Sequence, residues 1–344
     1  MTQPTGTAMA AEIAETPDAV ARFFDREAGP LRDLGAALRR LAPRFAVTCA
    51  RGSSDHAAMY FKYALEILAG IPVASIGPSV ASIYHAPLRL QGTLLLSVSQ
   101  SGQSPDIVAL QAAARAAGAF TVAVVNETES PLAREADAVL PLHAGPERSV
   151  AATKSCIASA AVLAALIAEW RQDAALLAAV RLLPESLARA NAADWSAPLA
   201  MLTQAASAYM VGRGPALPIA MEAALKLKET SVLHAEAFSG AEVMHGPLQL
   251  LHDGFPVLAF RPHDAAFAAM GDAIGRLAAA GGKIFTAEAG PAAPSRLAFT
   301  PTGHTLLDPL AMLLSFYRLA EQLSRARGHD PDRPSHLRKV TETV

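Results

Sequence analysis

Between residues 45 and 142, short apolar segments alternate strictly with segments that have the spacing of amphipathic helices. Apolar strands separated by helices form a parallel sheet covered on both faces, because each crossover helix packs back onto the sheet. We therefore expect a doubly wound α/β fold here. The predicted strands are 45–50, 72–76, 93–98, 120–125 and 138–142, and the predicted helices among them are 55–68 and 105–117.

The same pattern restarts in the second half of the chain. Ala-rich and Leu-rich helices over 151–189 and a linker at 191–198 separate the two halves. Each half has an Arg-Gly turn directly after an apolar strand, at Arg51-Gly52 and at Arg213-Gly214, which indicates an internal duplication. The second set of predicted elements is strand 208–214, helix 219–233, strand 256–260, helix 265–280, strand 283–287 and helix 309–327.

The chain is accordingly predicted to have four parts. Residues 1–42 form an N-terminal helical arm of one or two helices, with an interruption near Gly29-Pro30. Residues 43–190 and 195–330 form two tandem doubly wound parallel-sheet domains. Residues 331–344 form a Pro-rich C-terminal tail that ends in a cationic pair.

Composition limits the possible partners and location of the chain. Of 344 residues, 29 are Lys or Arg and 31 are Asp or Glu, so no polycationic signature for nucleic acid is present. The apolar run 156–168 falls short of the ~20 residues that a membrane-spanning helix needs. The two cysteines, Cys49 and Cys156, have no metal or redox spacing. We expect a cytoplasmic protein that binds neither nucleic acid nor membrane and that forms an oligomer.

Two Ser-rich turns follow predicted strands of the first domain. One is Arg51-Gly52-Ser53-Ser54-Asp55-His56 and the other is Ser99-Gln100-Ser101-Gly102-Gln103-Ser104. Ligands of open parallel sheets bind beyond the carboxyl ends of the strands, and hydroxyls with backbone amides there can hold a phosphate monoester. The alternative is that Ser54 and Ser104 cap helices. The pair of turns favours a sugar-phosphate site.

Acid-base candidates lie in the second domain and in the tail. Lys226 and Glu229 are three residues apart on one helix face, where a carboxylate beside an ammonium could move a proton between sugar carbons. An exposed ion pair is the alternative. His245 precedes Gly-Pro in a turn, where it could open a sugar ring or have no role. Taken alone, Lys339 is a solvated lysine.

Taken together, these residues resemble the tandem sugar isomerase (SIS) proteins, relatives of the isomerase half of glucosamine-6-phosphate synthase. The resemblance runs in order from about residue 43 and implies two flavodoxin-like SIS domains. The motifs that carry it are Gly52-Ser53-Ser54, Ser99-Gln100-Ser101-Gly102, Val150-Ala151-Ala152-Thr153-Lys154, Leu225-Lys226-Leu227-Lys228-Glu229 with His234-Ala235-Glu236, His245-Gly246-Pro247 and Leu337-Arg338-Lys339-Val340-Thr341.

The resemblance implies a role for each matching residue. Glu229 is implied as the base that moves a proton between C1 and C2 with Lys226 beside it, and His245 as the group that opens the ring across a homodimer interface. Lys339 matches a lysine that can form a Schiff base with a keto sugar. The substrate and its phosphate are implied to contact Gly52, Ser53, Ser54, Ser99, Gln100, Ser101, Ser104, Glu147, Val150 and Ala152.

Departures from the synthase narrow the expectation. Position 2 is Thr and not the nucleophilic cysteine of a glutaminase domain, so glutamine hydrolysis is not expected. Ala152 replaces a sugar-contacting serine. The segments RGSSDHA, PSVASIY, SQSGQSPD, VAATKS and LRKVTET look more like the stand-alone type II glucosamine-6-phosphate deaminases.

The activity that this resemblance implies is deamination of glucosamine 6-phosphate to fructose 6-phosphate and ammonia, without a metal or redox cofactor. One alternative is action on another amino-sugar or ketose phosphate, as a deaminase, deglycase or isomerase. Another is a non-catalytic sugar-phosphate sensor, since single SIS domains also serve as effector modules.

Overall fold

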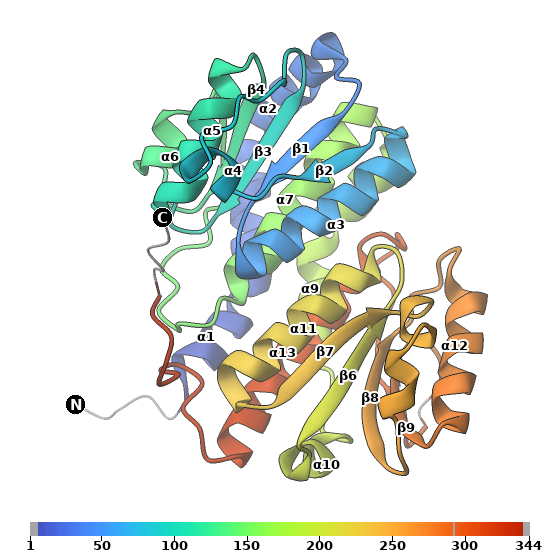
Figure 1. The fold of residues 1–344 in the computed structure, drawn as a ribbon. Helices are drawn as coiled ribbons and strands as arrows, with labels where there is room; N and C mark the ends of the chain where they lie inside the picture. The colour runs from blue at the N-terminus through green and yellow to red at the C-terminus, as the bar shows by residue number, and fades with distance from the viewer. Residues whose placement is uncertain (1–5, 292, 340–344) are drawn as a thin grey trace. The chain divides into compact units, whose positions relative to one another are not determined.

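The computed structural model describes residues 6–291 and 293–339 (Figure 1). The chain forms two compact units, each built around its own five-stranded sheet. Of the described residues, 16–147, 154–181 and 338–339 belong to what we call the first unit. Residues 6–15, 148–153 and 182–337 belong to the second unit. The predicted domain boundaries stay predictions.

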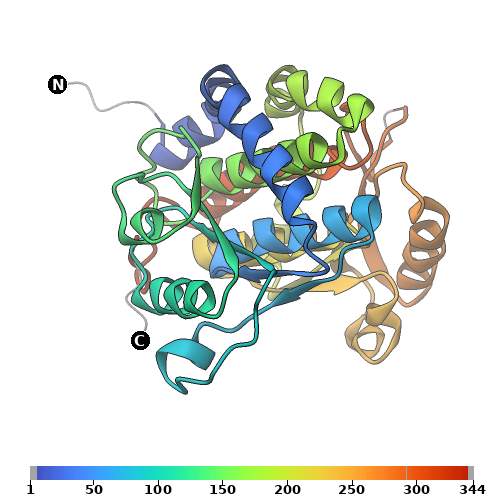
Figure 2. The same ribbon diagram turned by 90° about the horizontal axis from the view of Figure 1, so that it is seen from above.

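The sheet of the first unit is fully parallel, as its apolar runs predict, and its strands follow the order β2-β1-β3-β4-β5. Every residue of β1 and β3 is buried, because helices cover both faces (Figure 2). Side chains of α5 and α6 pack on one face against Val47, Leu95 and Ala123. The strands are β1 (Ala46–Cys49), β2 (Val73–Ser75), β3 (Leu94–Ser99), β4 (Phe120–Val125) and β5 (Ala138–Pro141).

The helices of the first unit follow the predicted alternation. They are α2 (Thr16–Leu41), α3 (Gly52–Ala69), α4 (Ser79–Ser82), α5 (Pro105–Ala116), α6 (Pro131–Arg134), α7 (Lys154–Arg171) and α8 (Ala174–Arg181). The predicted arm contains two helices, α2 and, in the second unit, α1 (Ala8–Ala14). The predicted interruption near Gly29-Pro30 is wrong, because α2 continues through Pro30. Proline removes the N–H that would bond the carbonyl of Arg26, and both residues are exposed, so water can take over that bond. The apolar run 156–168 lies inside the buried helix α7.

The sheet of the second unit repeats the architecture of the first. Its strands are parallel in the order β10-β9-β8-β6-β7, which read along the chain is the same second-first-third-fourth-fifth order as in the first sheet. The shared order supports the duplication that the two Arg-Gly turns indicate. The strands are β6 (Ser207–Gly212), β7 (His234–Ser239), β8 (Phe255–Phe260), β9 (Gly282–Ala287) and β10 (Arg296–Leu297).

The sequence pattern did not predict β7, β10 or the short elements of the second unit. β7 is an edge strand in which His234 and Glu236 are exposed, so it lacks the continuous apolar run of a central strand. The helices of this unit are α1 (Ala8–Ala14), α9 (Leu183–Asn191), α10 (Leu199–Gln204), α11 (Ala216–Ser231), α12 (Phe267–Ala279) and α13 (Asp308–Ala326), with 3₁₀ turns η1 (Glu242–Met244) and η2 (Pro247–Leu250).

The tail packs within the second unit before it reaches Arg338. Both carboxylate oxygens of Asp332 accept hydrogen bonds of 2.7 Å, from the backbone N–H groups of Ala8 and Met9. Those two groups begin α1 and have no partner inside the helix, so Asp332 caps α1 from the far end of the chain. The predicted tail residues 340–344, with Val340 and Thr341 of the closing motif, lie outside the described residues.

Candidate active site

A cavity of about 280 Å³ opens in the first unit where β1 and β3 end and α3 and α5 begin. The chain leaves β1 toward β2 on one side and β3 toward β4 on the other, so this is the switch point at which open α/β sheets bind ligands. We call this cavity the cradle. It is lined by Arg51, Gly52, Ser54, Val98, Ser99, Gln100, Ser101, Ser104, Ile107 and Lys339.

The cradle hydroxyls are not used up as helix caps. Ser104 is the N-cap of α5 but its side chain makes no capping hydrogen bond, and the N-cap of α3 is Arg51 and not Ser54. The Ser99 hydroxyl oxygen accepts the backbone N–H of Gly102 at 3.1 Å, which leaves its own O–H free to donate. The capping alternative therefore does not account for these serines.

The loop between β3 and α5 needs glycine at one position. Gly102 has φ +61°, and a Cβ added there would lie 2.2 Å from the Ser130 hydroxyl. Other residues rarely adopt this backbone conformation, and here the space is filled as well. Gly102 thus allows the loop to turn sharply and to present Gln100 and Ser101 to the cavity.

Besides Glu147, whose partner Lys339 lines the cavity, three of the predicted substrate residues do not line the cradle. The side chain of Ser53 is buried and its backbone carbonyl accepts the Cys156 thiol at 3.4 Å. Val150 and Ala152 belong to the second unit. A role for these three residues in binding stays a prediction from the family resemblance.

Glu147 and Lys339 form a buried ion pair at the cradle, although 192 residues separate them. Lys339 Nζ donates to Glu147 Oε2 at 3.0 Å, and Ser155 donates its backbone N–H and its hydroxyl at 3.0 and 2.7 Å. Burial alone would raise the pKa of Glu147, but the Lys339 ammonium and the Ser155 hydrogen bonds outweigh it, so this pKa lies below its ordinary value of 4.5. Glu147 is therefore a carboxylate at neutral pH.

Lys226 and Glu229 are paired on α11 of the second unit, but not as an exposed surface pair. The Lys226 side chain is fully buried, donates to Glu229 Oε2, and lies 3.4 Å from the equally buried Glu222. The Tyr317 hydroxyl on α13 donates to Glu222 at 2.9 Å. The surface-pair alternative is therefore wrong. A buried ammonium shared by two carboxylates fixes the side chain of Glu229 in one position.

Glu229 borders a second cavity, of about 550 Å³, within the second unit. Its side chain is 20% exposed, and the opposite wall is formed by the chain from Gly328 to Leu337. Leu337 lines this cavity and Lys339, two residues later, lines the cradle. His245 caps η1 and is exposed, in the turn that the sequence predicts.

Two residues near the candidate site were not identified from the sequence. Arg51 lines the cradle and pairs with Asp106, which is 1% exposed. Burial and the Asp106 carboxylate raise the pKa of the Cys49 thiol to about 12, so this cysteine is not a nucleophile near neutral pH. Glu222 lies four residues before Lys226, and that spacing was the signal that could have identified it.

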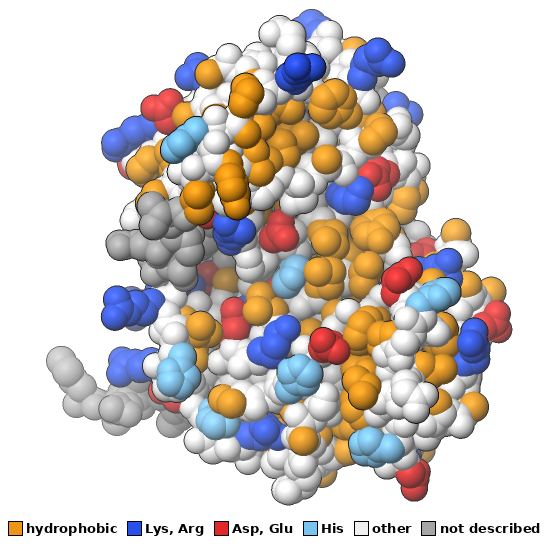
Figure 3. Space-filling model, in the orientation of Figure 1, with side chains coloured by type: hydrophobic (Ala, Val, Ile, Leu, Met, Phe, Trp, Pro, Cys, Tyr) orange, Lys and Arg blue, Asp and Glu red, His pale blue; other side chains and the backbone are white. Residues whose placement is uncertain are grey.

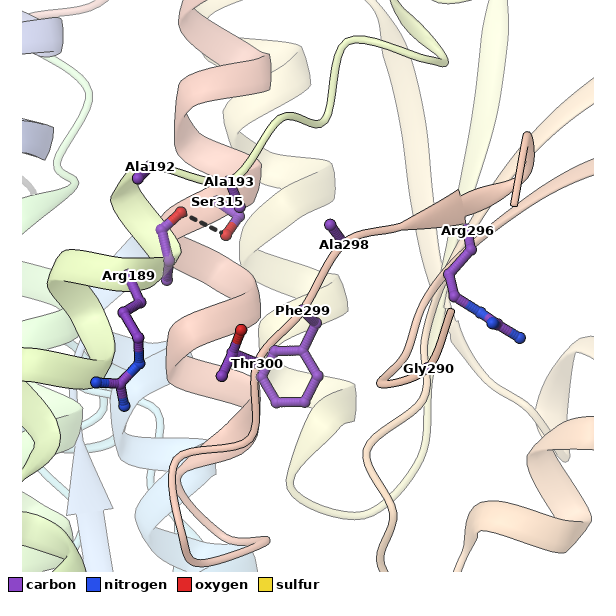
Figure 4. Close-up of a pocket in the computed structure, with 10 residues that line it drawn as sticks. Arg189, Ala192, Ala193, Gly290, Arg296, Ala298, Phe299, Thr300 and Ser315 are labelled. Atoms are coloured by element: carbon purple, nitrogen blue, oxygen red, sulfur yellow. Dashed lines mark hydrogen bonds between the residues drawn. The ribbon is translucent and has the colours of Figure 1, made fainter. Parts of the chain in front are cut away.

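Another cavity of about 410 Å³ lies beside α9 and α13, and Figure 4 shows its lining. In this lining, the Ser315 hydroxyl donates to the Ala190 carbonyl at 2.9 Å. Its Arg296 guanidinium donates to Glu288, at 2.7 Å from the nearer nitrogen. Both polar groups already have partners in the protein, and Ala192, Ala193 and Ala298 supply much of the remaining lining, so we prefer the cradle as the ligand site.

Surface charge agrees with the composition on the face that Figure 3 shows, where acidic and basic side chains are interspersed. In residues 6–291 and 293–339, no helix has the length and apolar character to span a bilayer. The same described residues contain no group of three or more His, Cys, Asp or Glu side chains suited to a metal ion.

Comparison with known proteins identifies the family. The profile of the SIS domain matches residues 44–169 and 201–287, one segment for each sheet, and the chain belongs to the SIS family. Over 96% of its length it is 35% identical to glutamine–fructose-6-phosphate aminotransferase of Zymomonas mobilis. It spans about 58% of that relative, so it corresponds to part of the longer enzyme.

Solved structures extend the comparison. A protein of Silicibacter pomeroyi, provisionally named a phosphosugar isomerase, is 46% identical with a TM-score of 0.90, over 95% of this chain and 100% of that one. The C-terminal domain of the Francisella tularensis aminotransferase is 25% identical with a TM-score of 0.81, over 97% and 100%. Glucosamine-6-phosphate deaminase of Thermotoga maritima shares the fold, at 20% identity and a TM-score of 0.77, over 98% and 100%.

Proposed function

We propose that this protein is a glucosamine-6-phosphate deaminase, which converts glucosamine 6-phosphate and water to fructose 6-phosphate and ammonia. The observation that carries the proposal is the cradle, because hydroxyls from two strand ends converge there on one small cavity. Ser54, Ser101 and Ser104 would hold the phosphate as hydrogen-bond donors. Charge-assisted hydrogen bonds of this kind are stronger than those between neutral groups.

The acid-base steps are assigned to the second unit. In the proposal His245 opens the sugar ring, and Glu229 then removes the proton from C2 and returns it to C1. The product is an imine at C2 with a hydroxymethyl group at C1, and water hydrolyses the imine to the ketone and ammonia. The buried Lys226 supports the assignment, because it holds Glu229 in a fixed position for proton transfer.

The role of Lys339 in the proposal is to orient the open chain or to form a covalent imine with the keto sugar. The ion pair with Glu147 holds the Lys339 Nζ beside the cradle, which suits orientation and the polarisation of an oxygen. Covalent attack requires that the ammonium first lose its proton. The proposal further includes a cytoplasmic homodimer in which a second chain helps to complete each site, and no cofactor.

A second candidate is an aldose–ketose isomerase that acts on another sugar phosphate. The 46% identity to a protein provisionally named a phosphosugar isomerase supports it. The same cradle and the same base would serve both reactions, since both begin with proton transfer between C1 and C2. The two candidates differ in whether nitrogen is released.

The test is an assay of ammonia and of fructose 6-phosphate after incubation of the purified protein with glucosamine 6-phosphate, without glutamine. The proposal predicts both products in equal amounts, and their formation about 10²- to 10⁴-fold more slowly by Glu229→Gln. Glu185→Gln on the exposed side of α9 is the matched control and should retain activity. If no ammonia forms while sugar phosphates still raise the melting temperature, the deaminase assignment is wrong and the isomerase assay follows.

A further inference from the structure

Arg51 and Lys339 bring positive charge to the cradle, but they are held in different ways. Lys339 pairs with Glu147, whose side chain has no exposed surface. The positive charge of Lys339 is therefore compensated inside the protein. The Arg51 side chain is 53% exposed and lines the cavity beside the serines. Of these two cations, Arg51 offers an incoming anion the larger exposed surface, since its side chain is 53% exposed and that of Lys339 is 25% exposed.

The Arg51 guanidinium is anchored along one edge. Nη2 and Nε donate to the same oxygen of Asp106, Oδ2, at 3.0 and 3.3 Å. A guanidinium has five N–H donors in a rigid plane, and these contacts use two of them. The other three make no hydrogen bond to the residues that the structure describes. Asp106 thus fixes the plane of the guanidinium and leaves its other edge available.

Asp106 itself explains why a cation is needed at this point. It lies in the first turn of α5, it is 1% exposed, and its Oδ1 accepts the backbone N–H of Ile107 at 2.9 Å. A buried carboxylate next to the cavity would repel a phosphate dianion, and low local polarity makes that repulsion stronger. Arg51 pairs with this carboxylate and offsets its charge toward the cavity.

We propose that Arg51 is a phosphate-binding residue of the cradle and that Asp106 is its positioning residue. The inference rests on the proposed function, because it takes the ligand of the cradle to be a sugar phosphate. The free edge of a guanidinium matches two oxygens of a phosphate, which a neutral sugar hydroxyl does not offer. Arg51 therefore selects phosphorylated over unphosphorylated sugars, whereas the serines accept either.

The test is titration calorimetry with fructose 6-phosphate, with inorganic phosphate as a second probe. Arg51→Gln loses one charge-assisted contact, so it should bind both probes about 10- to 100-fold more weakly than the wild type does. Arg51→Lys keeps the charge but loses the planar fork, so its affinity should fall between those of the wild type and of Arg51→Gln. Arg44→Gln is the matched control, because Arg44 is exposed and lies two residues before β1. It is therefore near the amino ends of the strands, whereas the cradle is at their carboxyl ends.

A double-mutant cycle tests the part assigned to Asp106. In the Arg51→Gln protein the negative charge of Asp106 beside the cavity is no longer offset by Arg51, so Asp106→Asn in that background should recover part of the lost affinity. A merely structural role of the Arg51–Asp106 pair predicts the opposite, namely that the double variant is less stable and binds no better. The melting temperature of each variant separates the two effects.

The proposed function and the role of Arg51 can be disproved separately. If the wild-type protein binds neither probe, the proposed function fails with the inference. If the wild type binds and Arg51→Gln binds equally well, the inference about Arg51 is wrong while the cradle stands. If inorganic phosphate loses affinity but fructose 6-phosphate does not, the sugar contacts dominate and Arg51 does not set specificity.

Discussion

The two sheets have the same strand order, yet their switch points carry different chemistry. In the first unit the ends of β1 and β3 present serine hydroxyls to a cavity. In the second unit the residue after β8 is Arg261, whose guanidinium stacks on the Phe267 ring at 3.6 Å and donates to Glu288 at 2.8 Å. Side chains that pair with one another thus occupy the ends of β8 and β9 in the second unit.

The comparison teaches that topology supplies a place for a ligand but not the site itself. Helix N-termini and strand ends meet at the switch point of every such sheet, and residue types decide what fills it. The second unit instead contributes the buried pair of Lys226 and Glu229 on α11. In this account the first copy binds the phosphate and the second copy supplies the base.

The largest effect is expected from Glu229→Gln, which removes the base and keeps the shape of the side chain. Turnover should fall about 10²- to 10⁴-fold, the usual contribution of a general base, while fructose 6-phosphate binding stays near wild type. Steady-state kinetics and calorimetry measure the two quantities separately. A loss of binding equal to the loss of turnover would break the division of roles between the copies.

Next in size is Glu288→Ala, directly after β9 of the second unit. Glu288 accepts from Arg261 and from Arg296 at 2.8 and 2.7 Å, and its removal leaves two largely buried cations without this partner. We expect a loss of about 3 kcal/mol in the free energy of unfolding by urea. Glu129→Ala, at an exposed pair with Arg134, is the control and should not change stability measurably.

The same Glu288→Ala protein sharpens the comparison in a second way. If the ion pairs of Glu288 are structural, the variant should bind fructose 6-phosphate with wild-type affinity below its melting temperature. A large loss of affinity without loss of stability would mean that this position, too, belongs to the ligand site.

A smaller effect is expected when hydroxyls are removed from the cradle. Each hydroxyl contributes about 1 kcal/mol, so Ser101→Ala combined with Ser104→Ala should weaken fructose 6-phosphate binding about 30-fold. Ser196→Ala in an exposed loop of the second unit is the control. Calorimetry measures the dissociation constants. If the double variant binds as tightly as the wild type, these two serines do not bind the phosphate.

The smallest effect concerns the pH dependence of stability at Glu147. Because the pKa of Glu147 is below 4.5 in the folded protein, its stabilising contribution is complete above pH 4.5 and is lost as the pH falls through the folded-state value. The wild type should exceed Glu147→Gln by about 1 kcal/mol at pH 7, and the difference should shrink in acid. Urea unfolding at pH 7, 5 and 4 measures it. A difference in stability that stays constant with pH would contradict the lowered pKa of Glu147.

The sequence was most informative where burial is uniform. Central strands such as β4, which is apolar except for the buried Thr121, were predicted correctly, whereas the edge strand β7 has exposed His234 and Glu236 and was missed. The serines of the cradle could be located because they follow such strands directly. The exact ends of helices depend on caps, as in α3, which begins at Gly52 and not near Asp55.

What the sequence could not predict are contacts between distant residues. The spacing of Lys226 and Glu229 fits a surface pair as well as a buried one, and packing against α13 makes it buried. The Arg51–Asp106 pair spans 55 positions and the Glu147–Lys339 pair spans 192. Such pairs depend on how the sheet brings strand ends together, and no local pattern encodes them.

The most direct test of the central claim is the position of the phosphate in crystals soaked with fructose 6-phosphate. The account predicts the phosphate at the ends of β1 and β3, within hydrogen-bond distance of the Ser101 and Ser104 hydroxyls. A phosphate bound instead beside Arg261 and Arg296 of the second unit would contradict it. In that case the second copy, and not the first, would be the phosphate-binding half of the protein.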